Sequence, residues 1–375
     1  MTKQRRSLLL LAVSTAFITV GLVLPGLTGA GSLEPPSSAV DGFGNPVPTM
    51  KSLDQVKPQI PISSLPYTIT DSGSYYLTGD LTTTDSGILV NADNVTIDLM
   101  GYSLIGPGSG ANTAIYMDGR SNVEIRNGTV RDFGNSGIIE NDPSNGRQHR
   151  IIGVRAVSNG GAGIELFGEG HLVKNCSATG NGYFGIQVWK GCTAIGNIVF
   201  KNRSTGIYAE SGCTITGNTV YDNQSGGIGA FSGNTITGNT VHDNEDVGIF
   251  ASVACTVTGN TVYDNQSSGI FAFQDGMVTG NTIGSNNKSD GSLGAGISVS
   301  YNCLVKNNMV ALNKQNNIFV AGFRNTIEQN FVTGSTNGIY FYQQNNFYSN
   351  NRACANTTPY ANTTGNTDGG GNITF

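Results

Sequence analysis

Carboxylate and basic side chains that could act in acid–base chemistry are few and widely spaced in this sequence. The candidates are Asp118, Glu165 and Glu210, with Arg147, His149, Arg150 and His171 between or beside them. Two carboxyl groups held roughly 5 to 9.5 Å apart can cleave a glycosidic bond, one of them as the general acid. Nothing in the spacing selects one pair, so ordinary surface charge stays open as the alternative.

Aromatic side chains recur at regular intervals and could bind a flat ligand. The aromatic and polar candidates are Gln187, Trp189, Tyr208, Glu210, Phe231, Phe250, Phe271 and Phe273, followed by Phe319, Tyr340 and Tyr342. A soluble protein seldom exposes so many rings without a use, so we expect a platform on which sugar rings stack. Two alternatives stay open: a long loop such as residues 284–295 covers the rings, or a second chain packs on them.

A repeat of about 21 residues must position these side chains. It is clearest from Gly206 to Asn223 and returns from Gly227, Gly248 and Gly269, with weaker copies before and after. Within each copy, apolar and polar residues alternate over three short segments, which predicts three short β-strands. The predicted fold is therefore all-β: a right-handed parallel β-helix solenoid of about twelve coils, with the aromatic residues on the outer face of the first strand.

Asparagine recurs at the predicted corner between strands two and three. Gly217-Asn218 occupies this corner in one repeat, and both residue types tolerate the left-handed conformation of a sharp turn. Stacking of the coils should turn the repeated Asn into a ladder whose amides satisfy the backbone groups of the corner. We assign to this ladder Asn175, Asn197, Asn218, Asn239, Asn260, Asn281, Asn308 and Asn350.

Asp222, Asp243 and Asp264 form a further column at the end of strand three. Three carboxylates about 5 Å apart repel one another unless water or a cation screens them. The column therefore either consists of turn-forming residues that cap their own backbone, or it holds Ca²⁺. Apart from this possible Ca²⁺, the sequence predicts no cofactor.

Cysteine occurs six times, and Cys192, Cys213, Cys255 and Cys303 share one inward position of their coils. Adjacent rungs bring Cys192 and Cys213 close enough for a disulfide, but parallel Cα–Cβ vectors hold the Cβ atoms too far apart for the usual geometry. Buried thiols are the preferred interpretation, with the disulfide left open. A zinc site is disfavoured because no C-x-x-C pair is present and the three His residues do not cluster with Cys.

Repeats of the form G-I-x-A followed by T-I-T-G-N-T-V-x-D-N, over roughly residues 87–356, resemble those of the pectate-lyase-like superfamily of right-handed β-helices. The segment from Pro61 to Leu99 is similar to the N-terminal cap of exported bacterial β-helix proteins. Resemblance to the lyases would imply calcium-binding acids with a Lys or Arg base, and resemblance to polygalacturonases would imply four catalytic motifs. Asn366-Thr367-Asp368 is a partial match to one of these motifs, and it lies in the tail.

The N-terminus has the order of an export signal: Lys3, Arg5 and Arg6, an uncharged run to Leu24, and small residues up to Ala30. A retained membrane anchor is the alternative. We expect a signal peptide at 1–30, a linker rich in Pro, Ser and Gly at 31–62, an N-terminal cap at 63–86, the β-helix at 87–357 and a C-terminal cap at 358–375. No other segment is apolar enough to cross a membrane.

Composition narrows the possible functions of a secreted, periplasmic or surface solenoid. A net charge of -5 offers no basic stripe for a nucleic acid. We expect a protein that binds an extracellular or envelope polysaccharide, with cleavage by lyase or glycoside hydrolase chemistry left open. The alternatives are a structural or adhesive surface solenoid and a metal-handling periplasmic β-helix resembling the NosD group, although clustered copper ligands are absent from the sequence.

Overall fold

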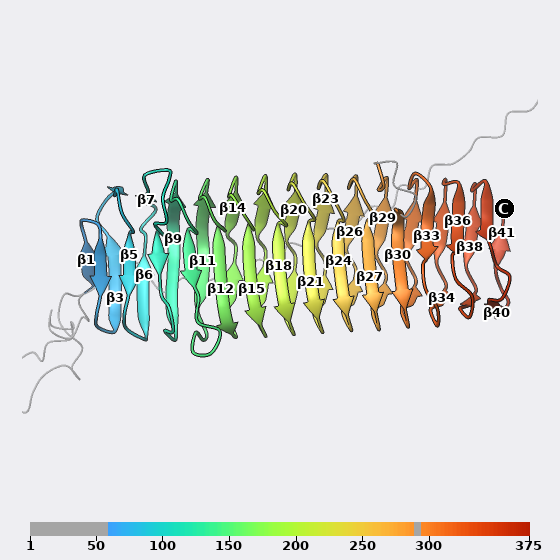
Figure 1. Ribbon diagram of the computed structural model, residues 1–375, viewed down its shortest axis with the longest axis horizontal. Helices are drawn as coiled ribbons and strands as arrows, with labels where there is room; N and C mark the ends of the chain where they lie inside the picture. The colour runs from blue at the N-terminus through green and yellow to red at the C-terminus, as the bar shows by residue number, and fades with distance from the viewer. Residues whose placement is uncertain (1–58, 289–293) are drawn as a thin grey trace, which may run out of the picture. The chain divides into compact units, whose positions relative to one another are not determined.

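Residues 59–288 and 294–375 of the computed structural model form the predicted right-handed parallel β-helix (Figure 1). These described residues contain β-strands and no α-helix, and none of their elements is a helix able to span a membrane. The expected signal peptide (1–30) and most of the expected linker (31–62) lie outside the described residues.

Each regular coil contains three strands, as predicted. In one coil they are β18 (Ile207–Ser211), β19 (Thr214–Thr216) and β20 (Thr219–Tyr221). First strands pair with first strands in one parallel sheet, whereas second and third strands form another sheet of 27 strands. The sheet of first strands has fourteen strands. Twelve of them belong to the twelve predicted coils, and the other two, β2 and β39, lie at the two ends.

The first strands form the 14-stranded sheet. They are β2 (Tyr67–Ile69), β5 (Ile88–Val90), β8 (Ile115–Tyr116), β10 (Ile138–Glu140), β12 (Ile164–Glu169), β15 (Ile186–Lys190), β18, β21 (Ile228–Ser232), β24 (Ile249–Val253), β27 (Ile270–Gln274), β30 (Ala295–Tyr301), β33 (Asn316–Val320), β36 (Asn337–Phe341) and β39 (Thr358–Ala361).

The second strands, two of which continue through the corner into the third, belong to the 27-stranded sheet. They are β1 (Ile60–Ile62), β3 (Gly73–Leu77), β6 (Val95–Asp98), β9 (Val123–Arg131), β11 (Arg150–Val157), β13 (Leu172–Lys174), β16 (Thr193–Ile195), β19, β22 (Thr235–Thr237), β25 (Thr256–Thr258), β28 (Met277–Thr279), β31 (Leu304–Lys306), β34 (Thr326–Glu328), β37 (Phe347–Ser349) and β40 (Thr367–Asp368).

The third strands complete this sheet. They are β4 (Leu81–Thr82), β7 (Ser103–Ile105), β14 (Ser177–Thr179), β17 (Ile198–Phe200), β20, β23 (Thr240–His242), β26 (Thr261–Tyr263), β29 (Thr282–Gly284), β32 (Met309–Ala311), β35 (Phe331–Thr333), β38 (Arg352–Cys354) and β41 (Ile373–Thr374).

Apolar residues at alternating positions fill the interior of the coils. Ile207, Ala209, Ile215 and Val220 are fully buried, as the alternation predicted. Their partners on adjacent rungs are again Ile, Val or Ala, so similar side chains stack along the axis. Each rung is thereby covered by the next, and the solenoid buries a continuous core.

The asparagine ladder is present, and its members from Asn197 to Asn351 are buried. Asn239 donates from Nδ2 to the carbonyl of Ile215 at 2.9 Å and to Oδ1 of Asn260 at 3.0 Å. Its own Oδ1 accepts the backbone N–H of Asn218 at 2.9 Å. The ladder contains Asn197, Asn218, Asn239, Asn260, Asn281, Asn308, Asn330, Asn351 and Asn372.

Asn175 and Asn350 were wrongly assigned to this ladder. At each corner the first residue adopts a left-handed conformation and the second points inward; Gly217, with φ of +63°, is an example of the first. Asn175 and Asn350 take that first position, with φ of +53° and +55°, while Cys176 and Asn351 occupy the ladder position. At these two corners the prediction was therefore displaced by one residue, because Asn stands where other corners have Gly.

We expect Asn239→Ala to destabilise the fold. The change removes the acceptor for the N–H of Asn218 and a donor to the carbonyl of Ile215, both inside the solenoid. Leaving these two buried backbone groups without hydrogen-bond partners should lower the free energy of unfolding by at least about 2 kcal/mol. The melting temperature should then fall by several degrees. Thermal unfolding followed by circular dichroism checks this, with Thr235→Ala on the exposed side of β22 as control. An unchanged melting temperature would contradict the stabilising role of the ladder.

Candidate functional site

Six side chains on the outer face of β12, β15 and β18 form a compact group, which we call the central array. Strand register places Glu165, Gln187 and Tyr208 in one row across the three strands. A parallel row consists of Phe167, Trp189 and Glu210, because outward positions alternate along each strand. Four of these six residues were predicted to bind substrate, and Glu165 and Glu210 were predicted as catalytic candidates.

Gln187 lies at the middle of its row and is almost completely buried, with 7% of its surface exposed. Its side-chain oxygen Oε1 has no hydrogen-bond donor among the described residues. A buried amide oxygen without a donor costs roughly 1 to 3 kcal/mol. The array therefore contains a buried amide oxygen that no donor of the described residues satisfies.

Aromatic rings flank this acceptor on both sides. The rings of Phe167 and Trp189 lie 4.7 Å apart, and Phe184 stacks on Tyr208 at 5.1 Å with an angle of 19° between the planes. Tyr208 donates its hydroxyl to Glu210 at 3.0 Å. Burial, followed by the Glu210 carboxylate, raises the pKa of Tyr208 to about 12, so its hydroxyl keeps its proton at neutral pH.

The predicted acids Asp118 and Glu165 do not form a catalytic pair. Glu165 accepts the hydroxyl of Ser136 at 2.7 Å. Asp118 follows β8, two rungs away and on the other row, which puts the two Cα atoms about 11 Å apart. Asp118 instead lies beside Tyr116, whose pKa is raised by burial and then by that carboxylate.

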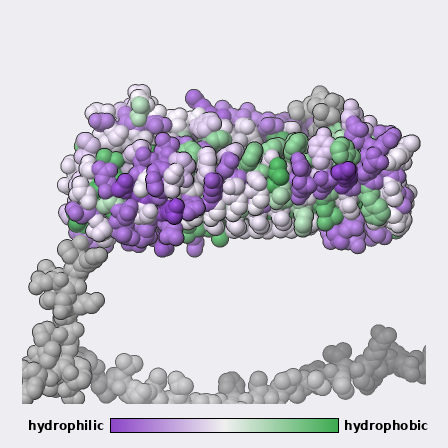
Figure 2. All heavy atoms as spheres, turned by 60° about the horizontal axis from the view of Figure 1, so that its bottom comes forward, coloured by the Kyte–Doolittle hydropathy of each residue, from purple (hydrophilic) through white to green (hydrophobic). Residues whose placement is uncertain are grey.

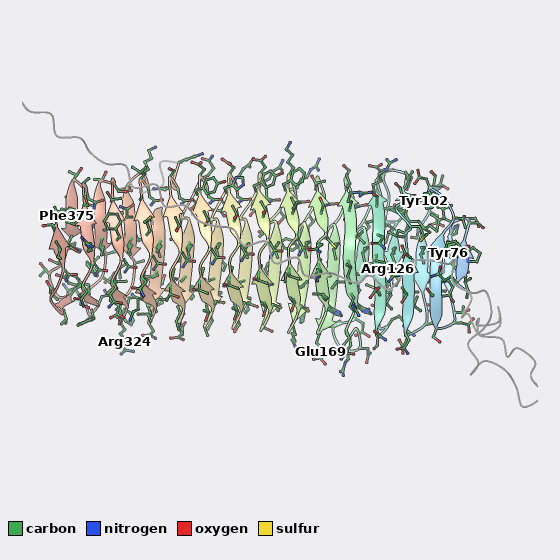
Figure 3. All side chains as sticks on the ribbon, turned by 180° about the vertical axis from the view of Figure 1, so that it is seen from behind. Tyr76, Tyr102, Arg126, Glu169, Arg324 and Phe375 are labelled. Atoms are coloured by element: carbon green, nitrogen blue, oxygen red, sulfur yellow. The ribbon has the colours of Figure 1, made fainter. Side chains whose placement is uncertain are left out.

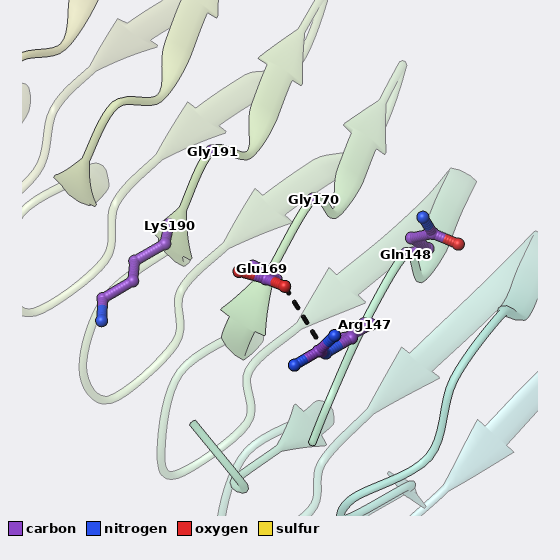
Figure 4. A pocket seen from close by; sticks show the side chains of 6 residues that line it. All are labelled: Arg147, Gln148, Glu169, Gly170, Lys190 and Gly191. Atoms are coloured by element: carbon purple, nitrogen blue, oxygen red, sulfur yellow. Dashed lines mark ion pairs between the residues drawn. The ribbon is translucent and has the colours of Figure 1, made fainter. Parts of the chain in front are cut away.

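A pocket of about 350 Å³ opens at the corner where β12 and β15 end (Figure 4). It is lined by Arg147, Gln148, Glu169, Gly170, Lys190 and Gly191. Arg147, a predicted catalytic candidate, pairs with Glu169 at 3.5 Å, and both side chains are more than half exposed. Because Lys190 directly follows Trp189, this pocket adjoins the central array and adds two cationic groups to it.

Gly168 explains how the chain can form this edge. It has φ of +92° and lies at a bulge in β12, and a Cβ there would approach the carbonyl oxygen of Gly146 to 2.0 Å. Glycine therefore allows the inserted segment that carries Arg147 to lie directly against the end of β12, where Arg147 pairs with Glu169.

His149 and His171 lie inside the solenoid, although they were predicted as surface groups near the candidate acids. Both are at most 1% exposed, and their rings stack at 4.9 Å. Nε2 of His149 faces Oε2 of Glu140 at 3.1 Å, and Glu140 is completely buried. The sequence analysis did not identify Glu140, which stands at an inward position where the next strand has Leu166.

Backbone contacts hold this buried group in place. Glu140 also accepts the N–H groups of Gly119 and Asp142 at 2.9 and 2.8 Å. His171 accepts the N–H of His149 at 3.1 Å and donates to the carbonyl of Phe167 at 2.6 Å. The group therefore ties the inserted segment after β10 to the interior beneath the central array, and it has no access to a substrate.

Four of the six cysteines, Cys192, Cys213, Cys255 and Cys303, continue the same inward column. Cys192 and Cys213 follow His171 on successive rungs, and all six cysteines are free thiols in the structure. Cys213 donates to the carbonyl of Trp189 at 3.0 Å. Burial raises the pKa values of Cys255 and Cys303, as expected for unreactive interior thiols.

Asp222, Asp243 and Asp264 occupy left-handed turn positions after the third strands, with φ of +53°, +53° and +58°. Nζ of Lys288 lies 3.1 Å from Asp264 and 3.6 Å from Asp243. In residues 59–288 and 294–375 no group of three His, Cys, Asp or Glu side chains could hold a metal ion. Lys288 thus screens two of these carboxylates, and the left-handed turn positions fit the turn-forming role that the sequence left open beside Ca²⁺.

The phenylalanines predicted as substrate contacts lie further along the same sheet. Phe231, Phe250 and Phe273 are 49%, 37% and 39% exposed, so none of the described residues covers them. Their planes are tilted: 60° between Phe250 and Phe271, and 83° between Phe271 and Phe273. These rings therefore present edges as well as faces, as do Phe167 and Trp189, whose planes are 42° apart.

Figure 3 shows Glu169 and Arg324 on the same long edge of the solenoid. Arg324 lies over the ring of Phe323 at 5.7 Å, and Phe323 contacts Tyr301 at 5.0 Å. This edge thus carries the charged pocket beside the central array and an aromatic cluster beside the phenylalanines.

Comparisons with known proteins agree with the architecture. A family model described as "Right handed beta helix region" matches residues 113–256 and 215–310. The A-module of the mannuronan C-5 epimerase AlgE6 from Azotobacter vinelandii is similar in structure, with TM-score 0.60, 16% identity, and coverage of 81% of this chain and 91% of that chain. The Dettilon tailspike protein gp208 gives TM-score 0.54, 16% identity, and 77% and 62% coverage. No curated protein matches the chain. These likenesses show the fold.

We expect the buried His171 to make the fold sensitive to acid. Burial, followed by the neighbouring His149, lowers its pKa from 6.5 to about 4. Between these values the unfolded chain binds a proton that the folded chain does not, so stability decreases as the pH falls from 6.5 to 4. The full effect is roughly 3 kcal/mol.

Chemical unfolding at pH 7, 5.5 and 4 measures this effect. Asn234 and Asn325 occupy the same inward column, which makes His171→Asn a suitable non-titrating variant. The variant should lose much less stability than the wild type over this range. Identical pH profiles for the two proteins would show that His171 does not contribute.

Proposed function

Because the chain belongs to the right-handed β-helix family, within the pectate-lyase-like superfamily, we propose that it binds a polysaccharide on its central array. The ligand lies across the first strands β12, β15 and β18, parallel to the solenoid axis. A mannuronan epimerase acts on a polysaccharide, and this agrees with the proposal.

The observation that carries the proposal is the unpaired oxygen of Gln187. It is nine-tenths buried and lies between Glu165 and Tyr208 in its row. A sugar hydroxyl placed between the surrounding rings donates to this oxygen and removes the cost of leaving it without a partner. Sugars combine such hydroxyls with apolar ring faces, and the array combines an acceptor and two carboxylates with the rings of Trp189 and Tyr208.

Binding without cleavage is the function that we propose. Glu165 and Glu210 lie on different rows and two rungs apart, so their Cα atoms are about 11 Å from each other. Each carboxylate already accepts a hydroxyl, from Ser136 and Tyr208 respectively. The two carboxylates therefore do not form the close pair that cleavage of a glycosidic bond by two carboxyl groups requires.

The pocket beside the array favours a ligand with carboxylate groups. Arg147 and Lys190 offer two cations against the carboxylate of Glu169. Arg147 can exchange its exposed pairing with Glu169 for a bidentate contact with a sugar carboxylate. We further propose that the chain meets this ligand outside the cytoplasm, where the signal expected at residues 1–30 would direct it.

We expect Gln187→Met to weaken polysaccharide binding while the fold stays intact. The substitution keeps the side-chain length and removes the unpaired oxygen, so the melting temperature should stay the same or rise. Retention on immobilised acidic polysaccharide should fall at least about tenfold. The matched control is Gln224→Met, at an exposed position outside the array. Undiminished retention by a folded Gln187→Met protein would reject the site.

We also expect the double change Arg147→Ala and Lys190→Ala to distinguish acidic from neutral ligands. Loss of the two cations should reduce affinity for a uronate-containing polysaccharide several-fold, and added salt should weaken the wild type in the same way. Binding to a neutral glucan should not change. Isothermal titration with both polymers, followed by analysis of products, also reports any cleavage. Equal losses for both polymers would contradict the role given to the pocket.

A further inference from the structure

The exposed phenylalanines alternate with small residues in a regular way. One outward row reads Phe231, Ser252, Phe273 and Ser300 on β21, β24, β27 and β30, so a ring is followed on each next rung by a small side chain. The rings are 49% and 39% exposed, whereas both serines are 8% exposed. The row is thus a series of raised rings and intervening depressions.

Reversing the order of the rungs exchanges rings and small residues in this first row, whereas the neighbouring row is symmetric about its midpoint. It reads Gly229, Phe250, Phe271 and Ser298, with small residues at the outside and two rings at the centre. In both rows the midpoint lies between β24 and β27. A rotation of 180° about an axis parallel to the strands at this point reverses the order of the rungs and keeps each row opposite itself.

We propose that this surface, made by the outer faces of β21, β24, β27 and β30, binds a second copy of this chain in antiparallel orientation. The rotation places Phe231 opposite Ser300 of the other copy and Phe273 opposite Ser252. It places Phe250 opposite Phe271, where two rings can pack together. Phe231 and Phe273 each face a depression on the other copy, and Phe250 and Phe271 face each other. This is the self-complementarity that a two-fold interface requires.

The exposed area is of the size that a dimer needs. With roughly 200 Å² for each aromatic residue, Phe231, Phe250 and Phe273 together expose about 250 Å². Tyr301 and Phe323, 37% and 43% exposed on the adjoining edge, raise this to about 400 Å². A stable interface buries about 800 Å² on each partner, so the rings alone provide half of it. The middle of the face seen in Figure 2 is pale to green, with hydrophilic side chains gathered toward both ends.

The rows also suit a protein partner better than a sugar. Phe273 meets Tyr301 at 87°, and the other contacts in the cluster are tilted as well, so the rings offer few parallel faces. Unlike the central array, these rows contain no carboxylate or amide side chain. The same rotation places β15, which carries Gln187 and Trp189, opposite β36 of the other copy. The dimer therefore covers the central array, and polysaccharide binding belongs to the monomer.

Sedimentation velocity of the full chain at about 1 to 100 µM tests the interface. The wild type should form dimers, whereas Phe273→Asp should be monomeric, with dimer affinity reduced more than tenfold because a carboxylate would be buried in an apolar contact. Phe347→Asp is the matched control: Phe347 is 37% exposed but lies on β37 of the other sheet. It should leave dimerisation unchanged.

Ser252→Trp provides a second variant, since it fills the depression opposite Phe273 and should also give monomers. Polysaccharide retention should persist in the Phe273→Asp monomer, so the two proposals fail separately. A wild type that remains monomeric at 100 µM would overturn the interface. Dimers that persist in both folded variants would overturn it equally.

Discussion

Satisfaction of backbone polar groups at the buried corners is the constraint on which this solenoid depends. Strand pairing between rungs satisfies the N–H and C=O groups of the strands, but each sharp corner leaves further groups pointing inward. An inward Asn carries both a donor and an acceptor, so it can bond the corner backbone and the Asn of the next rung. The ladder from Asn197 to Asn372 therefore keeps the coils in register over most of the fold.

A second ladder does the same after the third strands. It contains Asn159, Asn181, Asn202, Asn223, Asn244, Asn265, Asn286 and Asn313. With both corners held in this way, the first strands are free to vary on their outer face. Asn286, in the loop 284–295 that was expected to cover the rings, is a buried member of this ladder.

Departures from the repeat are concentrated next to the central array. Glu140 replaces an apolar core residue, and His149 and His171 replace Cys or Asn in their column. The inserted segment that carries Arg147 lies between Glu140 and His149 in the sequence. A buried carboxylate is tolerated here because His149 and two backbone N–H groups surround it. The regular coils after Gly206 lack these features and carry the alternating phenylalanines and small residues. The two halves of one sheet thus have different chemistry on the same scaffold.

The sequence by itself determined the fold class, the three strands in each coil, the inward apolar positions and the outward aromatic rows, because all of these follow from local alternation and a constant repeat. It misplaced Asn175 and Asn350 by one residue, since the left-handed position accepts either Gly or Asn. It did not reveal the partners of Glu140 or the burial of His149 and His171. Those depend on contacts between different coils around an insertion, whose path has no local periodicity. The unpaired oxygen of Gln187 and the depressions at Ser252 and Ser300 arise in the same way: neighbouring rungs, and not adjacent residues, decide what each side chain meets.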